Sequence, residues 1–330
     1  MWLGSAFDRL AQQRIFAGRG WIDAQPGMVA QGRAVCLFVG PGTAPNDLID
    51  LIERFLRVFV YVAPQARPDW MQAVTSAGHF AYPYAVLVGR EDGLDHCRRL
   101  ARDGNPGLHG ASIVHLTDNA DPRRLRQVQA LYADANMFPQ PPYFMAGGDD
   151  RVLTSVLLDA DGEAIGATMY HHLAGVGPGF DSIACGLNST VRPRRAGVSA
   201  AGERVRSLSP AAWLNASAIV RCRELFGVRE IWSCARAANR RAIAFHHQLG
   251  ARDSEEVSFF CAEHRMALPD RRHTGEPATL TAGQSGGGRS NGDQAGRSRS
   301  LPISRPAGST RSRMSVCYAG RPSCERDRGG

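Results

Sequence analysis

The sequence predicts a mixed α/β protein in three parts, at residues 1–108, 109–264 and 265–330. Three observations support this. Short apolar runs alternate with amphipathic stretches over the first 264 residues, as in strands and helices that share a layered core. Residues 109–264 carry the longer and more regular series of such elements. From residue 265 onward Gly, Ser, Pro and Arg dominate, and too few apolar residues remain to offset the entropy of ordering, so we expect a disordered tail.

The first part resembles a small α/β layer. Its apolar runs predict strands at Val35–Val39, Val58–Val62 and Tyr84–Val88. Amphipathic spacing predicts helices at Asn46–Leu56, Asp69–Ser76 and Gly93–Ala101. We therefore expect residues 1–108 to form an α/β domain of their own.

The second part begins with a strand and continues as a long mixed series. Strands are predicted at Ala111–Leu116, Arg151–Leu158, Ala164–His171, Asp181–Val191, Val228–Cys234 and Val257–Ala262. Helices are predicted after the cap Asp121, over Pro210–Phe226 and over Arg240–Leu249. Gly227 and Gly250 follow two of these helices at the position where a left-handed residue commonly ends a helix.

The strand at Asp181–Val191 alternates in polarity. Its regular period of two places Ile183, Cys185, Leu187 and Val191 on one side and Ser182, Ala184, Asn188 and Thr190 on the other. Because Cys185 lies on the more apolar side, we interpret it as a core residue and not as a nucleophile.

The charge of the chain is concentrated in the tail. The formal net charge is +8, of which residues 265–330 carry +7, leaving +1 for the first 264 residues. A body this close to neutral lacks the electrostatic footprint of a nucleic-acid-binding protein. All 39 basic residues are Arg. The absence of Lys excludes a Schiff-base mechanism and a Walker-type phosphate loop.

The eight cysteines include no Cys-x-x-Cys pair, and several lie in apolar runs. They are typical of buried small hydrophobic residues in a reducing compartment and not of disulfides or a zinc site. Charged residues interrupt the N-terminus, and no apolar stretch approaches the ~20 residues that would cross a bilayer. We expect a soluble, cytoplasmic protein without membrane contact.

Two segments carry a family resemblance. The run from Asn239 to Gly250 has an Asn, a small apolar stretch, the aromatic Phe245 and a closing Leu-Gly. Arg223-Glu-Leu-Phe-Gly-Val-Arg-Glu-Ile231 precedes it as a helix-to-strand junction. Together with the order of elements, these segments resemble the GNAT acyl-CoA N-acyltransferases over residues 110–264. The resemblance implies transfer of an acetyl group from acetyl-CoA to an amine in a ternary complex.

The resemblance also implies where acetyl-CoA would bind. A backbone N–H of the strand segment Leu187–Val191 would polarise the thioester carbonyl, and this strand, with Asn239 and Phe245, would contact the donor. The family's pyrophosphate loop matches Arg194–Ser199, so the implied contacts include Leu187, Ser189, Val191, Arg194, Arg195, Gly197 and Ser199. A second register, Arg206–Ala211, lies at a better distance from Gly227 but lacks the glycines. Both registers remain open at this point.

The same resemblance suggests two catalytic residues. Asp181 is the carboxylate nearest to that strand and would relay a proton; the alternative is a solvated strand-entry residue. His246 stands where the family often has a Tyr that protonates the leaving thiolate. An imidazole that titrates near neutrality could do this, and the alternative is a surface His on an amphipathic helix. We expect the neighbouring His247 to face away from whatever His246 faces.

Two further histidines end a strand. His171 and His172 either line the acceptor pocket or are exposed at the strand end. These histidines have no third ligand at a suitable spacing, so we predict no metal site.

Three functional hypotheses follow. The first is an acetyl-CoA-dependent N-acetyltransferase for a small-molecule or protein amine, with residues 1–108 contributing to substrate selection. The second is a non-catalytic module of the same fold that binds acyl-CoA or a protein partner. The third, a nucleic-acid binder acting through the tail, is disfavoured by the nearly neutral body. The sequence leaves the acceptor and the oligomeric state open.

Overall fold

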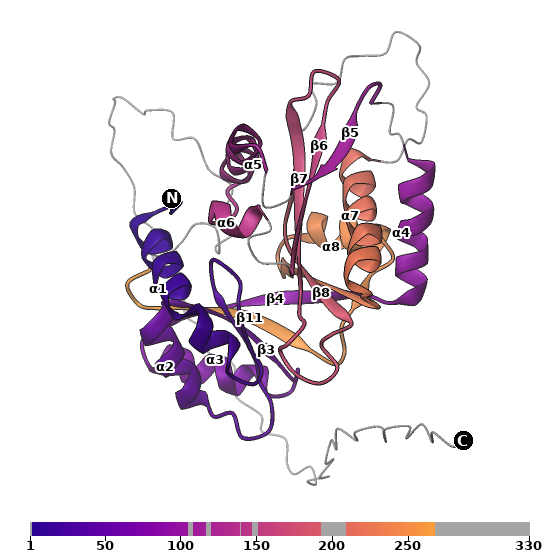
Figure 1. Cartoon of the computed structure of the whole chain (residues 1–330). Coiled ribbons are helices and arrows are strands. Elements are labelled where there is room, and N and C mark those ends of the chain that lie inside the picture. The colour runs from indigo at the N-terminus through magenta and orange to yellow at the C-terminus, as the bar shows by residue number, and fades with distance from the viewer. Residues whose placement is uncertain are drawn as a thin grey trace, which may run out of the picture. The chain divides into compact units, whose positions relative to one another are not determined.

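The computed structural model describes residues 2–104, 108–116, 120–138, 140–146, 151–192 and 209–267. These residues form one mixed sheet with the strand order β1-β2-β3-β11-β4-β9-β8-β7-β6-β5, and β10 pairs with β4 beside this path (Figure 1). The strands are β1 (Met28–Ala30), β2 (Val35–Phe38), β3 (Arg57–Val62), β4 (Phe80–Gly89), β5 (Ser112–His115), β6 (Val152–Leu158), β7 (Ala164–His172), β8 (Ile183–Val191), β9 (Glu230–Arg236), β10 (Arg252–Asp253) and β11 (Ser258–Glu263).

Helices cover both faces of this sheet. They are α1 (Ala6–Asp23), α2 (Pro45–Phe55), α3 (Arg67–Ser76), α4 (Glu91–Asp103), α5 (Pro122–Asp134), α6 (Pro142–Met145), α7 (Pro210–Phe226) and α8 (Arg240–Gln248). The predicted mixed α/β class is confirmed, and each predicted strand and helix corresponds to an observed element. The structure adds α1, β1, α6 and β10. The sequence did not predict α1, because its buried apolar residues are only Ala11, Ile15 and Ile22, too few for a clear amphipathic pattern.

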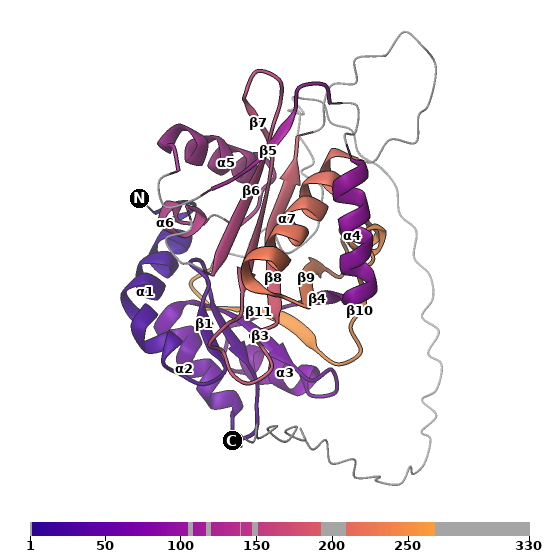
Figure 2. The ribbon, with the colours of Figure 1, turned by 45° about the vertical axis from the view of Figure 1, so that its right-hand side comes forward.

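The two faces of the strands β6 to β9 carry different helices. On one face α4, α7 and α8 pack in a core that includes Tyr170 and Ala184; we call it the α7 face. In both views α4 and α7 lie side by side there (Figure 2). On the other face α5 and α6 pack against Val156, Ala167 and Met169; we call it the α5 face.

The first part of the chain belongs to the same sheet. β11 lies between β3 and β4 and pairs antiparallel with both, and β4 pairs on its other side with β9. The strands of residues 1–108 are therefore contiguous only through β11, which comes from residues 258–263. A separate N-terminal domain is not shown. The proposed tail lies outside the described residues apart from its first three positions.

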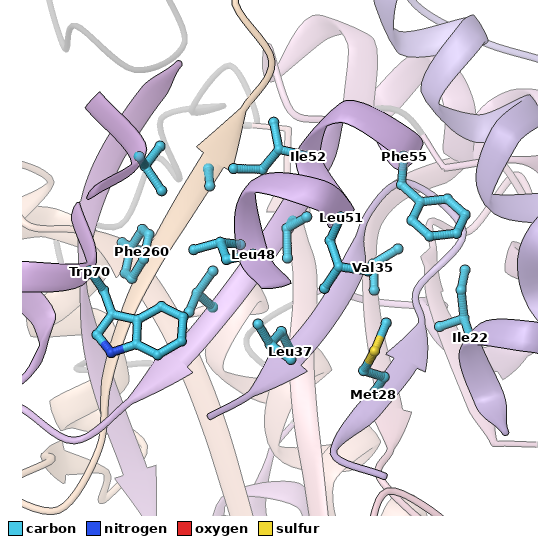
Figure 3. Close-up of a cluster of buried hydrophobic side chains, with 14 of the residues drawn as sticks. Ile22, Met28, Val35, Leu37, Leu48, Leu51, Ile52, Phe55, Trp70 and Phe260 are labelled. Carbon is cyan, nitrogen blue, oxygen red and sulfur yellow. The ribbon is translucent and has the colours of Figure 1, made fainter. Parts of the chain in front are cut away.

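A large apolar core lies between this end of the sheet and the helices α1, α2 and α3. Leu48 and Ile52 of α2 and Val35 and Leu37 of β2 are almost fully buried in it (Figure 3). Phe260 of β11 packs into the same cluster, so the last described strand completes a core that is otherwise built from the first part of the chain.

A buried ion cluster fixes β11 to β3. Arg57 and Glu263 are directly opposite each other on the two strands, and Arg57 Nε donates to Glu263 Oε1 at 2.6 Å. Arg57 Nη2 also donates to Asp8 Oδ1 of α1 at 2.7 Å. Burial by itself lowers the pKa of Arg57, but Glu263 and Asp8 outweigh it and hold this pKa above its ordinary value. The cluster ties the two ends of the described chain together.

Among the described residues, no helix is long and apolar enough to cross a membrane.

Replacing the buried cation tests the role of this cluster. Arg57→Met leaves Asp8 and Glu263 buried without the guanidinium that both contact, and such a loss typically costs about 3–5 kcal/mol of folding free energy. We expect a decrease of this size in urea unfolding. The matched control is Arg126→Met on the exposed side of α5, which should change stability by less than about 0.5 kcal/mol. Equal stability of the two variants would contradict the assignment.

A truncation tests the continuity of the sheet. A chain of residues 109–267 lacks β4, so β9 loses its antiparallel neighbour and becomes an unpaired edge. We expect this fragment to aggregate or to show no cooperative unfolding, whereas residues 1–267 should unfold in one transition by circular dichroism. A stably folded, monomeric 109–267 fragment would show that the second part does not need β4.

Candidate functional site

β8 contains a bulge in its middle. Met169 of β7 pairs with Asn188 and the next residue, Tyr170, pairs with Gly186, so Leu187 is the extra residue. A bulge of one residue reverses the faces of all later side chains. The predicted alternation is therefore correct up to Leu187 and wrong beyond it. Asn188 and Thr190 lie on the α5 face with Cys185, while Ser189 and Val191 lie on the α7 face with Ala184.

β8 and β9 separate at the same place. Their parallel pairing extends from Ile183 opposite Glu230 to Gly186 opposite Ser233, and no pair follows. β8 stays paired with β7 as far as Val191. Every second backbone group of this stretch therefore points toward β9, where no strand pairs with it.

A cavity of about 910 Å³ occupies the region where the strands separate. Residues of both sheet faces line it, including Tyr170 and Asn215 from the α7 face and Tyr61 and Asn188 from the α5 face. The cavity therefore passes through the sheet between β8 and β9 and joins two chambers. We call them the α7 chamber and the α5 chamber.

The α7 chamber begins at the N-terminus of α7. Ser209 caps this helix and accepts a hydrogen bond from the N–H of Ala212. Ala211, in the first turn, lines the cavity. One turn later the buried Asn215 donates to Ser189 Oγ at 2.8 Å and accepts from Thr168 and Tyr170. This network holds α7 against β7 and β8 and keeps its positive end directed at the cavity.

α8 supplies the opposite wall of the α7 chamber. Asn239 caps the helix by accepting from the N–H of Ala242, and Asn239, Phe245 and His246 line the cavity. Burial, with a smaller contribution from His247, lowers the pKa of His246 to about 4. This value lies below the near-neutral pKa that the sequence suggested for His246, so the ring is uncharged at pH 7. His247 does not line the cavity and lies 3.5 Å from Asp253, away from His246's surroundings.

The α5 chamber contains a buried arginine from the first part of the chain. Arg33 is only 5% exposed. Its Nη1 donates to Asn188 Oδ1 at 2.5 Å and to the carbonyl of Phe138 at 3.4 Å, and its Nη2 donates to the carbonyl of Leu187, the bulged residue, at 3.0 Å. The amide of Gln140, turned with its oxygen toward the guanidinium, accepts from Nε at 3.2 Å. Burial and the charge of Arg57 lower the pKa of Arg33 to about 10.

A buried amide lies next to Arg33. Gln31 is fully buried and lines the cavity, and neither its side-chain oxygen nor its nitrogen has a hydrogen-bond partner among the described residues. The turn that presents both residues depends on Gly32, which has a φ of +65° and lies where a Cβ would come within 2.9 Å of Phe144.

The charges around the cavity are of one sign. No Asp or Glu is among the described residues that line the cavity, but three arginines are: Arg33, Arg236 and Arg241. Arg236 pairs across strands with Tyr84 on the α5 face, and Arg241 lies in the first turn of α8. The cavity therefore suits a ligand with negative charge.

The structure brings together six of the residues predicted from the sequence. Leu187, Ser189, Val191, Asn239, Phe245 and His246 all line the cavity. Arg194, Arg195, Gly197 and Ser199 lie outside the described residues. So does the first half of the alternative register, of which Ser209, Pro210 and Ala211 are described.

Three other candidates are not brought to the cavity. Asp181 is exposed before the start of β8, about 20 Å along the strand from Leu187, and its carboxylate accepts from the N–H of Gly175. His171 packs on Phe144, and His172 donates toward the carbonyl of Asp181. Both histidines are buried, so they are neither exposed strand-end residues nor lining residues of this cavity.

The six described cysteines are free thiols. Cys185 is buried on the α5 face beside the Tyr61 hydroxyl, and burial raises the pKa of its thiol to about 12. A thiol with so high a pKa is not a nucleophile at neutral pH, as the apolar side of the strand predicted.

One cluster among the described residues has the spacing of a metal site. Glu53, His79 and His264 place one ligand atom each within 4.8 Å of one another. However, Nδ1 of His79 accepts the backbone N–H of Arg265, and Nδ1 of His264 accepts that of Met266. The ring proton of each neutral imidazole must then be on Nε2, which faces the Glu53 carboxylate. Nε2 of His264 donates to Glu53 at 2.9 Å, whereas Nε2 of His79 lies 3.4 Å from that carboxylate without a hydrogen bond. With their ring protons on Nε2, the two neutral imidazoles offer no free lone pair to a metal ion at this place.

Sequence reasoning missed Gln31, Arg33, Asn215 and Arg236. Two of them had a local signal. Asn215 is a polar residue on the apolar side of a helix, and Arg33 directly precedes a continuous apolar strand. A polar residue at such a position has to find a buried partner or a ligand.

The low pKa of His246 predicts a specific pH dependence. Between about pH 6.5 and 4 the unfolded chain binds a proton at this position and the folded chain does not, so folding stability decreases as pH falls through this window. We expect His246→Gln to reduce that decrease in urea unfolding. His79 and His115, whose pKa values burial also lowers, remain in both proteins, so the difference between the two curves isolates His246. Parallel curves would contradict the burial of this ring.

Comparisons with known proteins concern the fold. No family model matches the chain, and no curated protein matches it. Solved structures of many GNAT proteins do. A tandem GNAT protein from the clavulanic acid biosynthesis pathway is 15% identical, with a TM-score of 0.44 over 70% of this chain and 75% of that protein. A GCN5-related N-acetyltransferase from Kribbella flavida is 12% identical, with a TM-score of 0.44 over 77% and 95%. A putative GNAT acetyltransferase from Novosphingobium aromaticivorans is 14% identical, with a TM-score of 0.42 over 79% and 99%.

Proposed function

We propose that this protein is an acyl-CoA-dependent N-acyltransferase that passes an acetyl group through the opening between β8 and β9. The observation that carries the proposal is the cavity that crosses the sheet and joins two chambers. Direct transfer needs such an arrangement, because donor and acceptor must approach one carbonyl carbon from different sides while both stay bound.

The α7 chamber has the features of the donor half. The N-termini of α7 and α8 both border it, and helix N-termini favour phosphate groups. Arg241 adds a positive charge in the first turn of α8. Beyond Gly186 no strand pairs with β8 on the side of β9, so the stretch from Leu187 to Val191, whose Leu187 carbonyl accepts from Arg33, offers a strand edge along which an amide-containing pantetheine arm would extend. The described residues therefore suit acetyl-CoA, and Arg194, Arg195, Gly197 and Ser199 remain the predicted loop contacts.

The reaction requires little covalent help from the protein. A C–N bond forms between the amine and the acetyl carbonyl, the C–S bond breaks, and one proton moves from the amine nitrogen to the departing sulfur. Unpaired N–H groups near the bulge at Leu187 would stabilise the negative charge on the carbonyl oxygen. His246, neutral at pH 7, would accept the proton from the amine and return it to the thiolate.

A second candidate is a module of this fold that binds acyl-CoA without turnover. No carboxylate lines the cavity among the described residues, and Asp181 lies far from it. Proton transfer would then depend on His246 alone, whose low pKa makes it a weak base. Binding combined with an absence of acetylation for every amine would favour this second function.

The test is titration of acetyl-CoA into the full chain, with Ala211→Glu as the variant. A carboxylate in the first turn of α7 does not weaken the helix itself, but it places a negative charge where the pyrophosphate would lie. We expect the parent to bind and the variant to bind at least about tenfold more weakly, a change of about 1.4 kcal/mol or more.

The matched control is Ala44→Glu, which places the same charge at the exposed start of α2, away from the cavity. It should bind like the parent. If a folded parent shows no heat of binding, the proposed function is wrong. If Ala211→Glu binds as tightly as the parent, the donor does not lie at the start of α7.

A further inference from the structure

We propose that the acceptor is a small amine that carries a carboxylate, and that Gln31 and Arg33 recognise it in the α5 chamber. This inference rests on the proposed function and adds a substrate class to it. Both residues lie on one turn, between β1 and β2, in the first part of the chain. The turn reaches the α5 face beside the bulge at Leu187, next to the place where the acetyl group would be transferred.

Arg33 has the properties of an anion anchor. It is buried, and its four assigned hydrogen bonds all go to uncharged acceptors. Arg33 forms no ion pair with any described residue, and one N–H of Nη2 has no acceptor among them. Asp8 and Glu263 contact the neighbouring Arg57 instead. A carboxylate of the ligand would provide the counter-charge that Arg33 lacks.

The unpartnered side chain of Gln31 independently supports a polar ligand in the α5 chamber. The side-chain amide of Gln31 is buried without hydrogen-bond partners among the described residues, which costs folding free energy. An apolar side chain of the same length would fill the same space without this cost, so packing does not explain the presence of Gln31. Its carbonyl oxygen can accept from an amine and its N–H₂ can donate to a carboxylate. A ligand with both groups close together satisfies Gln31 and Arg33 at once.

The remaining walls of the α5 chamber favour an apolar body on this ligand. Phe59, Tyr61, Phe138 and Phe259 line it, and Arg236 adds a second positive charge beside Tyr84. No described acidic side chain is present to bind a polyamine or a second ammonium group. The chamber thus suits an amino acid with an apolar side chain better than a cationic amine.

The experiment measures acetyl-CoA turnover by the full chain with phenylalanine, phenylalaninamide and 1-amino-2-phenylethylphosphonate. The amide keeps the amine and the ring but removes the negative charge, and the phosphonate changes the kind of anion. We expect kcat/KM to be at least about tenfold higher for phenylalanine than for its amide, the loss that follows when a charged hydrogen bond is missing. A faster phosphonate would overturn the assignment to a carboxylate.

Three variants test whether Gln31 and Arg33 bind the carboxylate of the acceptor. Gln31→Met removes the amide while keeping the length of the side chain. It should leave Tm equal or higher and lower kcat/KM for phenylalanine about tenfold, with less effect on the amide. Arg33→Met should remove the preference for the acid, while acetyl-CoA still binds. If Arg33→Met does not fold, Asn188→Asp replaces it as the test, because it supplies a carboxylate to Arg33 from within the protein and should also abolish the preference.

Arg126→Met on the exposed side of α5 is the matched control and should keep the parent's preference. Equal loss on acid and amide in Gln31→Met and Arg33→Met would show that the turn is only structural and would overturn the inference. Efficient acetylation of the amide by the parent would overturn it as well, but would leave the proposed function intact. If no amine is acetylated although acetyl-CoA binds, the proposed function is wrong and the inference with it.

Discussion

The insertion of β11 between β3 and β4 is the constraint on which the rest of the fold depends. It brings the last described strand into the sheet of the first part and leaves β4 to pair with β9. The ion pair between Arg57 and Glu263, directly opposite each other, fixes the register of this insertion. Because β9 is held by β4 on one side, it can separate from β8 on the other side and remain part of the sheet. The opening through the sheet therefore requires both ends of the described chain.

The bulge at Leu187 links this architecture to chemistry. Adjacent residues of any strand point to opposite faces, and the bulge decides that Asn188 faces the α5 chamber and Ser189 the α7 chamber. Asn188 holds Arg33 and Ser189 holds Asn215. The extra residue Leu187 thus decides which polar side chain of β8 lies on each side of the opening. The turn with Gln31 and Arg33, from the first part of the chain, completes the α5 chamber.

The charged groups of the α7 chamber and of the α5 chamber suit different parts of the proposed reaction. Helix N-termini and Arg241 border the α7 chamber, where we propose that the donor binds, whereas Arg33 and Arg236 line the α5 chamber, where we propose that the acceptor binds. His246 lies in the α7 chamber, where burial lowers the pKa of its ring to about 4 and so keeps it uncharged at pH 7. The described walls contribute no negative charge, so proton transfer would take place between the reactants and one uncharged imidazole.

The bounds of single helices and strands follow from signals within the segments that form them. α7 has the predicted bounds, because Ser209 and Pro210 begin it and Gly227 ends it with a φ of +67°, and these signals act within one helical turn. The segment from Asn239 to Gly250 was likewise recognisable, and five of its residues line the cavity. The tertiary structure decided which strands pair, where β8 bulges and what surrounds Arg33. Proximity in the chain suggested Asp181, which lies at the wrong end of the strand, whereas Gln31 and Arg33 reach the cavity from more than 150 positions away. Long-range strand pairing and buried charge depend on partners that no local pattern contains, because their free energy arises only when distant segments exclude water together.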